Sequence, residues 1–486
     1  MSEIERTNTR SVTNRDADAD VIVLGVGTAG EDLSLMLLDA GLDVIGIEPN
    51  LIGGECPYWA CLPSKIMVRA AKAIQEAGRV GEMAGEVDVT PDWKPVAEKV
   101  RWLTGGWDDS VARERYRNRG GRPIKARGRL TGPRTVAAGD ETYTARRGIV
   151  IATGTEPFIP PIPGLDEVDY WTTHDLIAMQ EIPESMIVIG AGSSGAELGW
   201  VAAQFGANVT FVEAEDHILP SEEPEASAVV EEAFAADGIQ VRTGARAEQV
   251  ESRDGSIVVT LAGGEELEAE RLVLATGRKV DVSGLGLESA GLDGSARFIE
   301  VDENLRAADG IWAMGDVTGD ALLSLVAVYH SKIVAAEILG QDHPPVRYDA
   351  VPRVTFTNPE VGSVGMTEAD ARAAGRDVVA VVKQLPATFA GMVHWVERGI
   401  IKLVADRETG ALIGATVAGP KAGDVFGMLN LAVHAGVPLA ELQSMLYGFP
   451  GLYSAIGEAL GAYGRGVTTV VDPEYQGLEV LDTIKP

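Results

Sequence analysis

The glycine pattern Gly-x-Gly-x-x-Gly occurs twice in this chain, and it constrains the fold more than any other feature. The first copy begins at Gly25 and the second at Gly190. A short apolar run precedes each copy and an apolar helical pattern follows it. A second apolar run then ends at an acidic residue 23 positions after the first glycine, at Glu48 and at Glu213. This context predicts two βαβ units, and therefore two dinucleotide sites.

The residues of each unit have distinct expected tasks. The glycines allow the backbone to approach a pyrophosphate, the helix directs its N-terminus at the phosphates, and the acidic residue accepts hydrogen bonds from a ribose. The predicted dinucleotide-binding residues are Gly25, Gly27, Gly30 and Glu48 in the first unit, and Gly190, Gly192, Gly195 and Glu213 in the second.

Three further segments end a short apolar strand beside a glycine. They are residues 149–154, 272–277 and 311–316, which end at Gly154, Gly277 and Asp316. Each strand end could lie against a bound dinucleotide. An ordinary strand-to-turn junction explains each of them as well, and from these residues alone it is the simpler interpretation.

The only two cysteines, Cys56 and Cys61, closely follow the first βαβ unit. This number excludes a secreted disulfide scaffold, and their closeness suggests a redox pair or a metal pair. Residues 62–73 form a plausible helix with Pro63 in its first turn, which would place Cys61 at a helix N-terminus where the thiolate is favoured. Buried free thiols or a structural disulfide remain alternatives. A metal site would need further ligands and no histidine lies nearby, so we expect none.

Composition restricts the partners and the location of the protein. Lys and Arg total 41 and Asp and Glu total 72, which gives a formal net charge of −31. Such a charge argues against a nucleic-acid partner or an anionic membrane. The sequence has no run of 18 apolar residues, and its first 20 residues lack the apolar core of a secretory signal. We therefore expect a cytoplasmic protein without a membrane partner.

The pattern changes near Val351. Short strands are expected over residues 354–357, 399–406 and 411–419, followed by a helix over residues 424–435. This alternation predicts a third, α+β domain. The fold class expected for the whole chain is therefore α/β, with two Rossmann-like dinucleotide-binding domains and a C-terminal α+β domain.

Two dinucleotide units with a Cys-x4-Cys pair just after the first resemble the class I pyridine nucleotide–disulfide oxidoreductases. This family includes dihydrolipoamide dehydrogenase, glutathione reductase and mercuric reductase. The most specific shared piece is Gly-Gly-x-Cys-x4-Cys-x-Pro-Ser-Lys at residues 53–65. Weaker shared pieces are residues 152–154, 275–278, 315–316 and 356–360, and the likeness extends from about residue 20 to residue 462.

The resemblance implies a domain order and a dimer. It assigns residues 20–157 and 281–346 to an FAD-binding domain, residues 158–280 to an inserted NAD-binding domain and residues 347–486 to a dimerisation domain, after a disordered tail over residues 1–19. The protein would be a homodimer acting on a small-molecule substrate. We expect NADH to be preferred to NADPH, because Glu213 can repel a 2′-phosphate and no Lys or Arg lies between Arg147 and Arg242.

The resemblance also implies roles for single residues. Hydride would pass from the nicotinamide to FAD, and two electrons would pass on to Cys56–Cys61 and then to a small-molecule disulfide or another oxidised acceptor. Cys61 would contact the flavin and Cys56 would exchange with substrate. Lys65 and Glu197 would form a pair near the reactive flavin nitrogen, although two solvated helix charges are the alternative from the residues alone. By matching position, the resemblance also places Gly54, Gly154 and Asp316 at FAD, and Gly277 at the nicotinamide nucleotide.

One departure from the family concerns its C-terminal His-Pro-Thr-x-x-Glu pattern, whose His serves as acid and base. Phe449 stands at the His position and Ser454 at the Glu position, and the last histidine is His434. A carboxylating relative, 2-ketopropyl-coenzyme M oxidoreductase/carboxylase, also has Phe there. Thioether cleavage, carboxylation-like chemistry, quinone reduction and a low-turnover flavin redox sensor therefore stay open. Candidate substitutes for the histidine are Tyr447, Tyr453 and Glu458. Mercuric-ion reduction is not expected, because the tail cysteines of mercuric reductase are absent.

Overall fold

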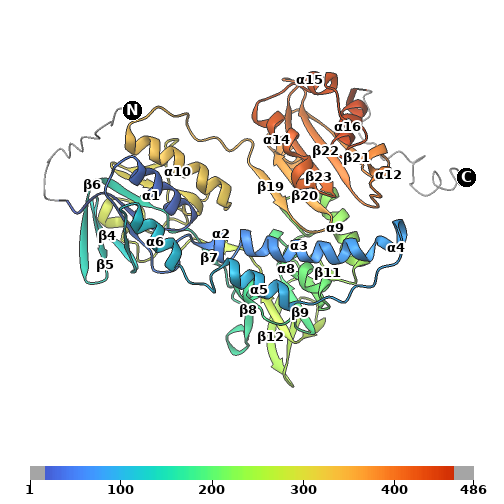
Figure 1. The fold of residues 1–486 in the computed structure, drawn as a ribbon, viewed down its shortest axis with the longest axis horizontal. Coiled ribbons are helices and arrows are strands. Elements are labelled where there is room, and N and C mark those ends of the chain that lie inside the picture. The colour runs from blue at the N-terminus through green and yellow to red at the C-terminus, as the bar shows by residue number, and fades with distance from the viewer. Residues whose placement is uncertain (1–16, 465–486) are drawn as a thin grey trace, which may run out of the picture. The chain divides into compact units, whose positions relative to one another are not determined.

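The structure is a computed structural model that describes residues 17–464. The chain forms two compact units (Figure 1). The first contains residues 17–58, 105–156 and 279–346, and the second contains residues 59–104, 157–278 and 347–464. The chain passes between the units five times, and two of these crossings lie within β7 (Glu156–Pro157) and β16 (Arg278–Lys279). Most of the tail expected over residues 1–19, and the last residues of the expected dimerisation domain, lie outside the described residues.

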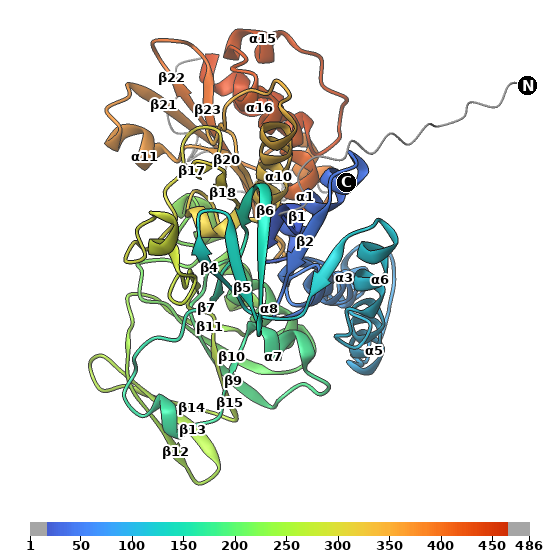
Figure 2. The ribbon, with the colours of Figure 1, turned by 90° about the vertical axis from the view of Figure 1, so that its left-hand side faces the viewer.

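The first unit is built on an eight-stranded sheet with the order β17-β18-β6-β1-β2-β3, to which β4 and β5 are joined through β6. The central strand β1 pairs in parallel with β2 and β6, and Figure 2 shows β6 and β1 next to each other. The strands are β1 (Ala19–Leu24), β2 (Val44–Ile47), β3 (Arg122–Ile124), β4 (Gly128–Gly132), β5 (Thr135–Ala138), β6 (Glu141–Ile151), β17 (Arg306–Ala308) and β18 (Ile311–Ala313).

Two long helices of the first unit, α1 and α10, pack against each other. Leu33 and Leu37 of α1 are fully buried in a core shared with Val334 of α10, and each such side chain contributes roughly 1.5–3 kcal/mol by leaving water. The helices of this unit are α1 (Thr28–Asp39), α2 (Glu55–Tyr58), α6 (Ser110–Asn118), η2 (Leu287–Ala290), η3 (Gly315–Thr318) and α10 (Ser324–Leu339).

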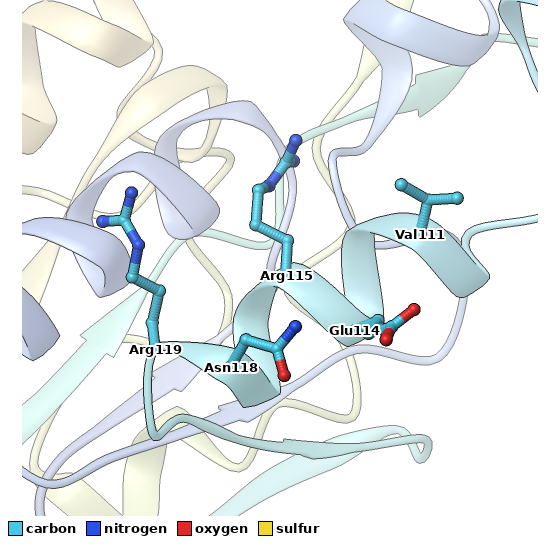
Figure 3. Close-up of a pocket in the computed structure, with 5 residues that line it drawn as sticks. All are labelled: Val111, Glu114, Arg115, Asn118 and Arg119. Carbon is cyan, nitrogen blue, oxygen red and sulfur yellow. The ribbon is translucent and has the colours of Figure 1, made fainter.

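Helix α6 is joined to α1 by ion pairs. Arg115 and Arg119 leave the same side of α6 beside a shallow surface hollow (Figure 3). Arg115 pairs with Glu31, and Arg119 Nη1 lies 2.6 Å from Asp39 Oδ2. Because these pairs are largely exposed to solvent, they add little to stability and chiefly fix where α6 lies.

The second unit contains a parallel five-stranded sheet with the order β11-β10-β9-β15-β8 and a separate antiparallel sheet, β12-β13-β14. The strands are β8 (Tyr170–Thr172), β9 (Ser185–Ile189), β10 (Asn208–Val212), β11 (Gln240–Arg242), β12 (Ala247–Arg253), β13 (Ser256–Leu261), β14 (Glu266–Ala269) and β15 (Arg271–Leu274). The helices are α3 (Cys61–Gly78), α4 (Val80–Met83), α5 (Lys94–Leu103), η1 (Leu165–Glu167), α7 (Thr173–Ala178), α8 (Ser193–Gln204) and α9 (Pro224–Ala236).

The C-terminal part of the second unit is an antiparallel sheet with the order β19-β20-β23-β22-β21 and helices packed against it. Its strands are β19 (Pro352–Thr355), β20 (Glu360–Gly365), β21 (Val378–Gln384), β22 (Ile400–Asp406) and β23 (Leu412–Gly419). Its helices are α11 (Glu368–Ala373), α12 (Phe389–Val393), α13 (Ala422–Val425), α14 (Gly427–His434), α15 (Leu439–Ser444) and α16 (Ser454–Gly464).

The expected α/β fold class is confirmed, and two helix boundaries differ from expectation. The helix expected over residues 62–73 begins at Cys61 and continues to Gly78, because the residues after Ala73 are good helix formers. The helix expected over residues 424–435 is divided into α13 and α14 at Phe426, between two glycines that weaken a continuous helix. Within the described residues, no helix is both long enough and apolar enough to cross a membrane.

Candidate active site

The first glycine pattern forms a tight turn between β1 and α1. Gly25 has a φ of +87°, and a Cβ atom there would lie 2.3 Å from the carbonyl oxygen of Ala152. A Cβ atom at Gly30 would lie 2.0 Å from the Gly25 carbonyl oxygen. Side chains are therefore excluded at both positions, which explains why the pattern requires glycine there.

Glu48 follows β2, and two backbone N–H groups fix its carboxylate. Oε2 accepts from Val26 at 2.8 Å, and Oε1 accepts from Asn50 at 2.7 Å. Burial raises the pKa of Glu48, while these hydrogen bonds and the charge of Lys125 act in the opposite direction. The carboxylate is thus held at the end of the strand, as the sequence predicts for a ribose-binding residue.

A third part of this site is the η3 turn after β18. Gly315 has a φ of +73°, and Asp316 Oδ2 accepts from the Thr155 hydroxyl at 2.8 Å. The Gly315 N–H donates to Nδ1 of His330 at 3.0 Å. The sequence predicted Asp316 but missed Thr155 and His330, because neither lies in a motif. Gly154, three residues after the end of β6, has a φ of +67°.

These residues fit an FAD dinucleotide. The N-cap residue of α1 is Gly27, which has no side chain to satisfy the first N–H groups of the helix, so they can receive a pyrophosphate. Gly54 lies against Gly27, because a Cβ atom at Gly27 would be 3.7 Å from the Gly54 Cα. Glu48 and Asp316 would supply carboxylates for its hydroxyl groups.

The two cysteines lie in adjacent helices. Cys56 is in α2, and Cys61 is the first residue of α3, as the sequence predicted; both are half-buried. Within the first unit, the carbonyl oxygen of Tyr58 accepts from the indole N–H of Trp107 at 3.3 Å. Trp107 has a φ of +62°, an unfavourable value for a large side chain.

Within the second unit, Trp59 stacks on His174, with ring centroids 4.7 Å apart and an interplanar angle of 19°. Trp59 stands between the two cysteines in the sequence. Its partner on α7 could not have been found from a motif.

Lys65 and Glu197 form the pair that the resemblance implied. Lys65 Nζ contacts Glu197 Oε2, and Glu197 is buried. Glu197 Oε1 accepts from the Phe356 N–H at 2.8 Å, and Lys65 Nζ lies 4.7 Å from the centroid of the Phe356 ring. The pair is therefore held by three elements, α3, α8 and the end of β19, and is not two solvated charges.

Further along α3, Lys72 pairs with Glu360 and Gln75 bonds to Asn358. The segment 356–360, which carried part of the resemblance, thus lies along one face of α3 and holds the helix that begins at Cys61.

The second glycine pattern repeats the geometry of the first. Gly190 has a φ of +97°, and a Cβ atom there would lie 2.4 Å from the Ala275 carbonyl oxygen. Glu213 accepts from the N–H groups of Ala191 at 2.7 Å and Glu215 at 3.1 Å. A Cβ atom at Gly192, the N-cap residue of α8, would meet no atom within 4 Å. The two remaining predicted glycines are Gly195, packed against the Gly190 carbonyl, and Gly277, which has a φ of +94°.

Two protein-family models match this chain. The model described as pyridine nucleotide-disulphide oxidoreductase matches residues 19–337, and the dimerisation-domain model of the same name matches residues 351–460.

The chain belongs to the pyridine nucleotide–disulphide oxidoreductase family.

Curated relatives agree. A dihydrolipoyl dehydrogenase of Halobacterium salinarum is 34% identical over 469 residues, which cover 93% of this chain and 98% of the relative. A mercuric reductase of Staphylococcus aureus is 32% identical over 445 residues, 88% of this chain and 79% of the relative. The protein is thus an FAD-dependent oxidoreductase that uses a nicotinamide nucleotide.

Solved structures share the fold. LpdA of Mycobacterium tuberculosis has a TM-score of 0.80 at 27% identity, covering 91% of this chain and 99% of that one. The HOCl-induced flavoprotein disulfide reductase RclA of Escherichia coli has a TM-score of 0.79 at 24% identity, with the same coverage, and at that identity shows the fold alone.

The C-terminal segment shows what replaces the family histidine. Phe449 is 69% exposed and packs edge-to-face on Phe389, with ring centroids 5.7 Å apart. The Tyr447 hydroxyl donates to the Leu442 carbonyl, and the Tyr453 hydroxyl accepts from a backbone N–H. Both tyrosines therefore support local structure.

Glu458 differs from the two tyrosines. Its Oε1 accepts from the Phe389 N–H at 3.3 Å, and burial raises its pKa. Its carboxyl group is therefore biased toward the protonated form. Ser454, at the position of the family glutamate, is buried. Among the described residues, no cluster of His, Cys, Asp and Glu could hold a metal ion.

Proposed function

We propose that this enzyme uses NADH to reduce a small-molecule disulfide, or another oxidised acceptor, through Cys56 and Cys61. The observation that carries the proposal is the position of Cys61 at the start of α3, one turn before the Lys65–Glu197 pair. One NADH and one proton would be consumed for each disulfide reduced to two thiols.

The residues of the chain would divide this work. When bound, FAD accepts a hydride from the nicotinamide and delivers two electrons to the cysteine disulfide. The N-terminus of α3 favours the thiolate of Cys61, and Cys56 exchanges with the acceptor. Glu197 and Phe356 hold the Lys65 charge in one place, where it stabilises negative charge developing nearby.

Preference for NADH over NADPH rests on Glu213. Its carboxylate is fixed at the end of β10 by two N–H groups, and Glu215 and Asp216 follow it after Ala214. A 2′-phosphate would meet this group of negative charges, whereas a 2′-hydroxyl would find an acceptor.

The substrate should suit a site without the family histidine. A positioned acid or base is worth about 10²–10⁴-fold, and Phe449 cannot act as either. We therefore expect weak activity with lipoamide-type substrates and glutathione disulfide. The natural acceptor either has a low-pKa leaving thiol or receives its proton from another group, for which Glu458 is the candidate.

A second copy of the chain would complete the enzyme. Five exposed apolar side chains on and beside α12 form what we call the α12 face: Phe389, Met392, Val393, Trp395 and Phe449. Phe389 is 61% exposed and Trp395 is 52% exposed, which is costly unless another surface covers them. All five lie within the matched dimerisation domain. A homodimer in the cytoplasm, where thiols stay reduced, would follow.

The deciding experiment is an anaerobic titration of the purified protein with NADH, followed by a screen of oxidised acceptors. Uptake of four electrons per FAD, two by the flavin and two by the cysteine pair, supports the proposal. Uptake of only two electrons would show that the cysteines are not redox-active. High activity on lipoamide or glutathione disulfide would refute the expectation drawn from Phe449.

A second candidate is non-disulfide chemistry that needs an aprotic site, and the exposed Phe449–Phe389 pair favours it. Phe449→His separates the two. If native turnover is kept and ordinary disulfide reductase activity appears, the phenylalanine merely replaces a missing base. Loss of native turnover would show that the apolar side chain is required.

A further inference from the structure

A buried histidine that belongs to none of the sequence motifs described above contacts the η3 turn of the first unit. His330 is on α10, in the interior, and its side chain is 0% exposed. It lies 15 residues after Gly315, and its Nδ1 atom is 3.0 Å from the Gly315 nitrogen. Fully buried histidines are uncommon, so this position calls for a physical explanation.

The hydrogen bond fixes the chemical form of the ring. The Gly315 N–H is a donor, so Nδ1 must be the unprotonated nitrogen and Nε2 must carry the proton. Protonating Nδ1 would turn the acceptor into a donor that faces another donor. The contact therefore exists only while the imidazole is neutral.

The turn that His330 holds carries a predicted FAD residue. Asp316 is the next residue after Gly315, and the Thr155 hydroxyl orients its carboxylate from the other side at 2.8 Å. Thr318 closes the turn by donating to the Gly315 carbonyl at 3.0 Å. The direction of the Asp316 side chain thus depends on the backbone conformation at Gly315.

We propose that His330 is a positioning residue for FAD: its neutral Nδ1 holds the Gly315 N–H and keeps the η3 turn in the conformation that presents Asp316. The inference rests on the FAD site of the first glycine unit, and it concerns how firmly that site retains the cofactor.

The surroundings of His330 oppose a positive charge. Burial lowers its pKa from 6.5 to about 4, and Asp320 offsets only part of this. The other charged groups nearby are Asp316 on η3 and Asp32 on α1, which accepts from Ser331. When the turn opens and water reaches the ring, the pKa returns toward 6.5. Below pH 6.5 the open turn binds a proton that the closed turn does not, so acid favours opening.

The consequence is a pH-dependent release of FAD. Opening of the turn becomes up to about 30-fold more favourable at pH 5 than at pH 8, from the two pKa values. FAD release that requires opening should accelerate by up to the same factor, and the dependence should flatten below about pH 4.

The test is stopped-flow measurement of FAD release on dilution of the holoenzyme, followed by the fluorescence of the released flavin, between pH 8 and pH 5. We expect the parent to show the acceleration. The His330→Gln variant keeps a hydrogen-bond acceptor that does not titrate. This variant should therefore release FAD slowly at both pH 8 and pH 5. His330→Leu leaves the Gly315 N–H without a partner, so it should release FAD about tenfold faster than the parent at pH 8, with no pH dependence. His343→Gln removes another histidine of the same unit and should behave as the parent does.

Two results would overturn the proposal: a parent whose release rate does not change with pH, or a His330→Gln variant that keeps the parental pH dependence. The parental measurement stands even if a variant fails to fold. If the parent protein purifies without FAD and cannot be reconstituted with FAD at pH 8, the FAD site itself is refuted. The two failures are therefore distinguishable.

Discussion

The two glycine units use the same turn and the same carboxylate geometry, but the protein closes over only one of them. In the first, Gly54 lies against Gly27, and a Cβ atom at Gly54 would be 2.7 Å from the Gly27 Cα. In the second, the corresponding Gly192 has open space around it. The first turn is suited to a cofactor that stays, and the second to one that enters and leaves in each cycle.

The two carboxylates are buried alike, with Glu48 8% and Glu213 7% exposed, and they differ in their charged neighbours. Glu48 is buried with a raised pKa, and Lys125 supplies a compensating charge. Glu213 is closely followed by Glu215 and Asp216, and no Lys or Arg lies between Arg147 and Arg242. One βαβ design therefore gives a closed site and an open, negatively charged site, and the difference comes from residues outside the glycine pattern.

The largest effect is expected from placing a methyl group at the closed turn. Gly54→Ala puts a side chain at a φ of +69° and against the Gly27 backbone, so the purified variant should lack FAD and activity. Gly192→Ala should keep FAD and raise the KM for NADH several-fold, since its Cβ meets nothing. Absorbance at 450 nm per protein and steady-state kinetics measure both. Full FAD content in Gly54→Ala would contradict the comparison.

Next in size is the effect of the cysteines, which test whether electrons leave the FAD site through the two thiols. Cys61→Ser should abolish the long-wavelength band that a thiolate beside the flavin produces, whereas Cys56→Ser should show it permanently. Both should lose acceptor reduction at least 10³-fold, because the dithiol is gone. Absorption spectra under anaerobic NADH titration decide this, and parental spectra in both variants would make the pair structural.

A smaller effect is expected at the open site. Glu213→Gln keeps the shape and removes the charge, so the ratio of kcat/KM for NADH to that for NADPH should fall about tenfold. Glu215→Gln serves as the control. Glu215 bonds to Glu213 through its backbone N–H, so the loss of its side-chain charge should change the ratio less. An unchanged ratio in Glu213→Gln would show that this carboxylate does not select the cofactor.

The smallest effect concerns the pH dependence of the closed site. Because the pKa of Glu48 is raised, its ionised form costs stability above its usual pKa, and the cost is relieved as pH falls through the folded value. Glu48→Gln lacks this cost. The stability of the variant relative to the parent, measured on apoprotein by urea unfolding, should therefore be greater at pH 7 than at pH 5. The opposite trend would contradict the assigned direction.

The parts that sequence could predict were those with local requirements. Gly25 and Gly30 are needed because of atoms within their own βαβ unit or one strand away, so a short pattern encodes them. The position of Cys61 at a helix start follows from Pro63 and the apolar helix after it. The α/β fold class followed from these same local signals.

What the sequence could not supply were contacts between distant segments. His330 reaches Gly315 across a turn, and Phe356 completes the Lys65–Glu197 pair from another strand. No spacing rule connects these residues, because their meeting depends on how helices pack. The roles of the predicted site residues are predictions that the experiments above address.

The α12 face has a consequence for how the enzyme is handled. If a second subunit covers Phe389, Trp395 and Phe449, as we propose, the assembled form depends on subunit concentration by mass action. Dilution to assay levels would then uncover these side chains and lower specific activity with time. Replacing Phe389 and Met392 by Ser should raise the concentration at which this loss begins, whereas Val111→Ser, an exposed apolar residue of α6, should not. The enzyme should therefore keep its activity longer when it is stored at high protein concentration.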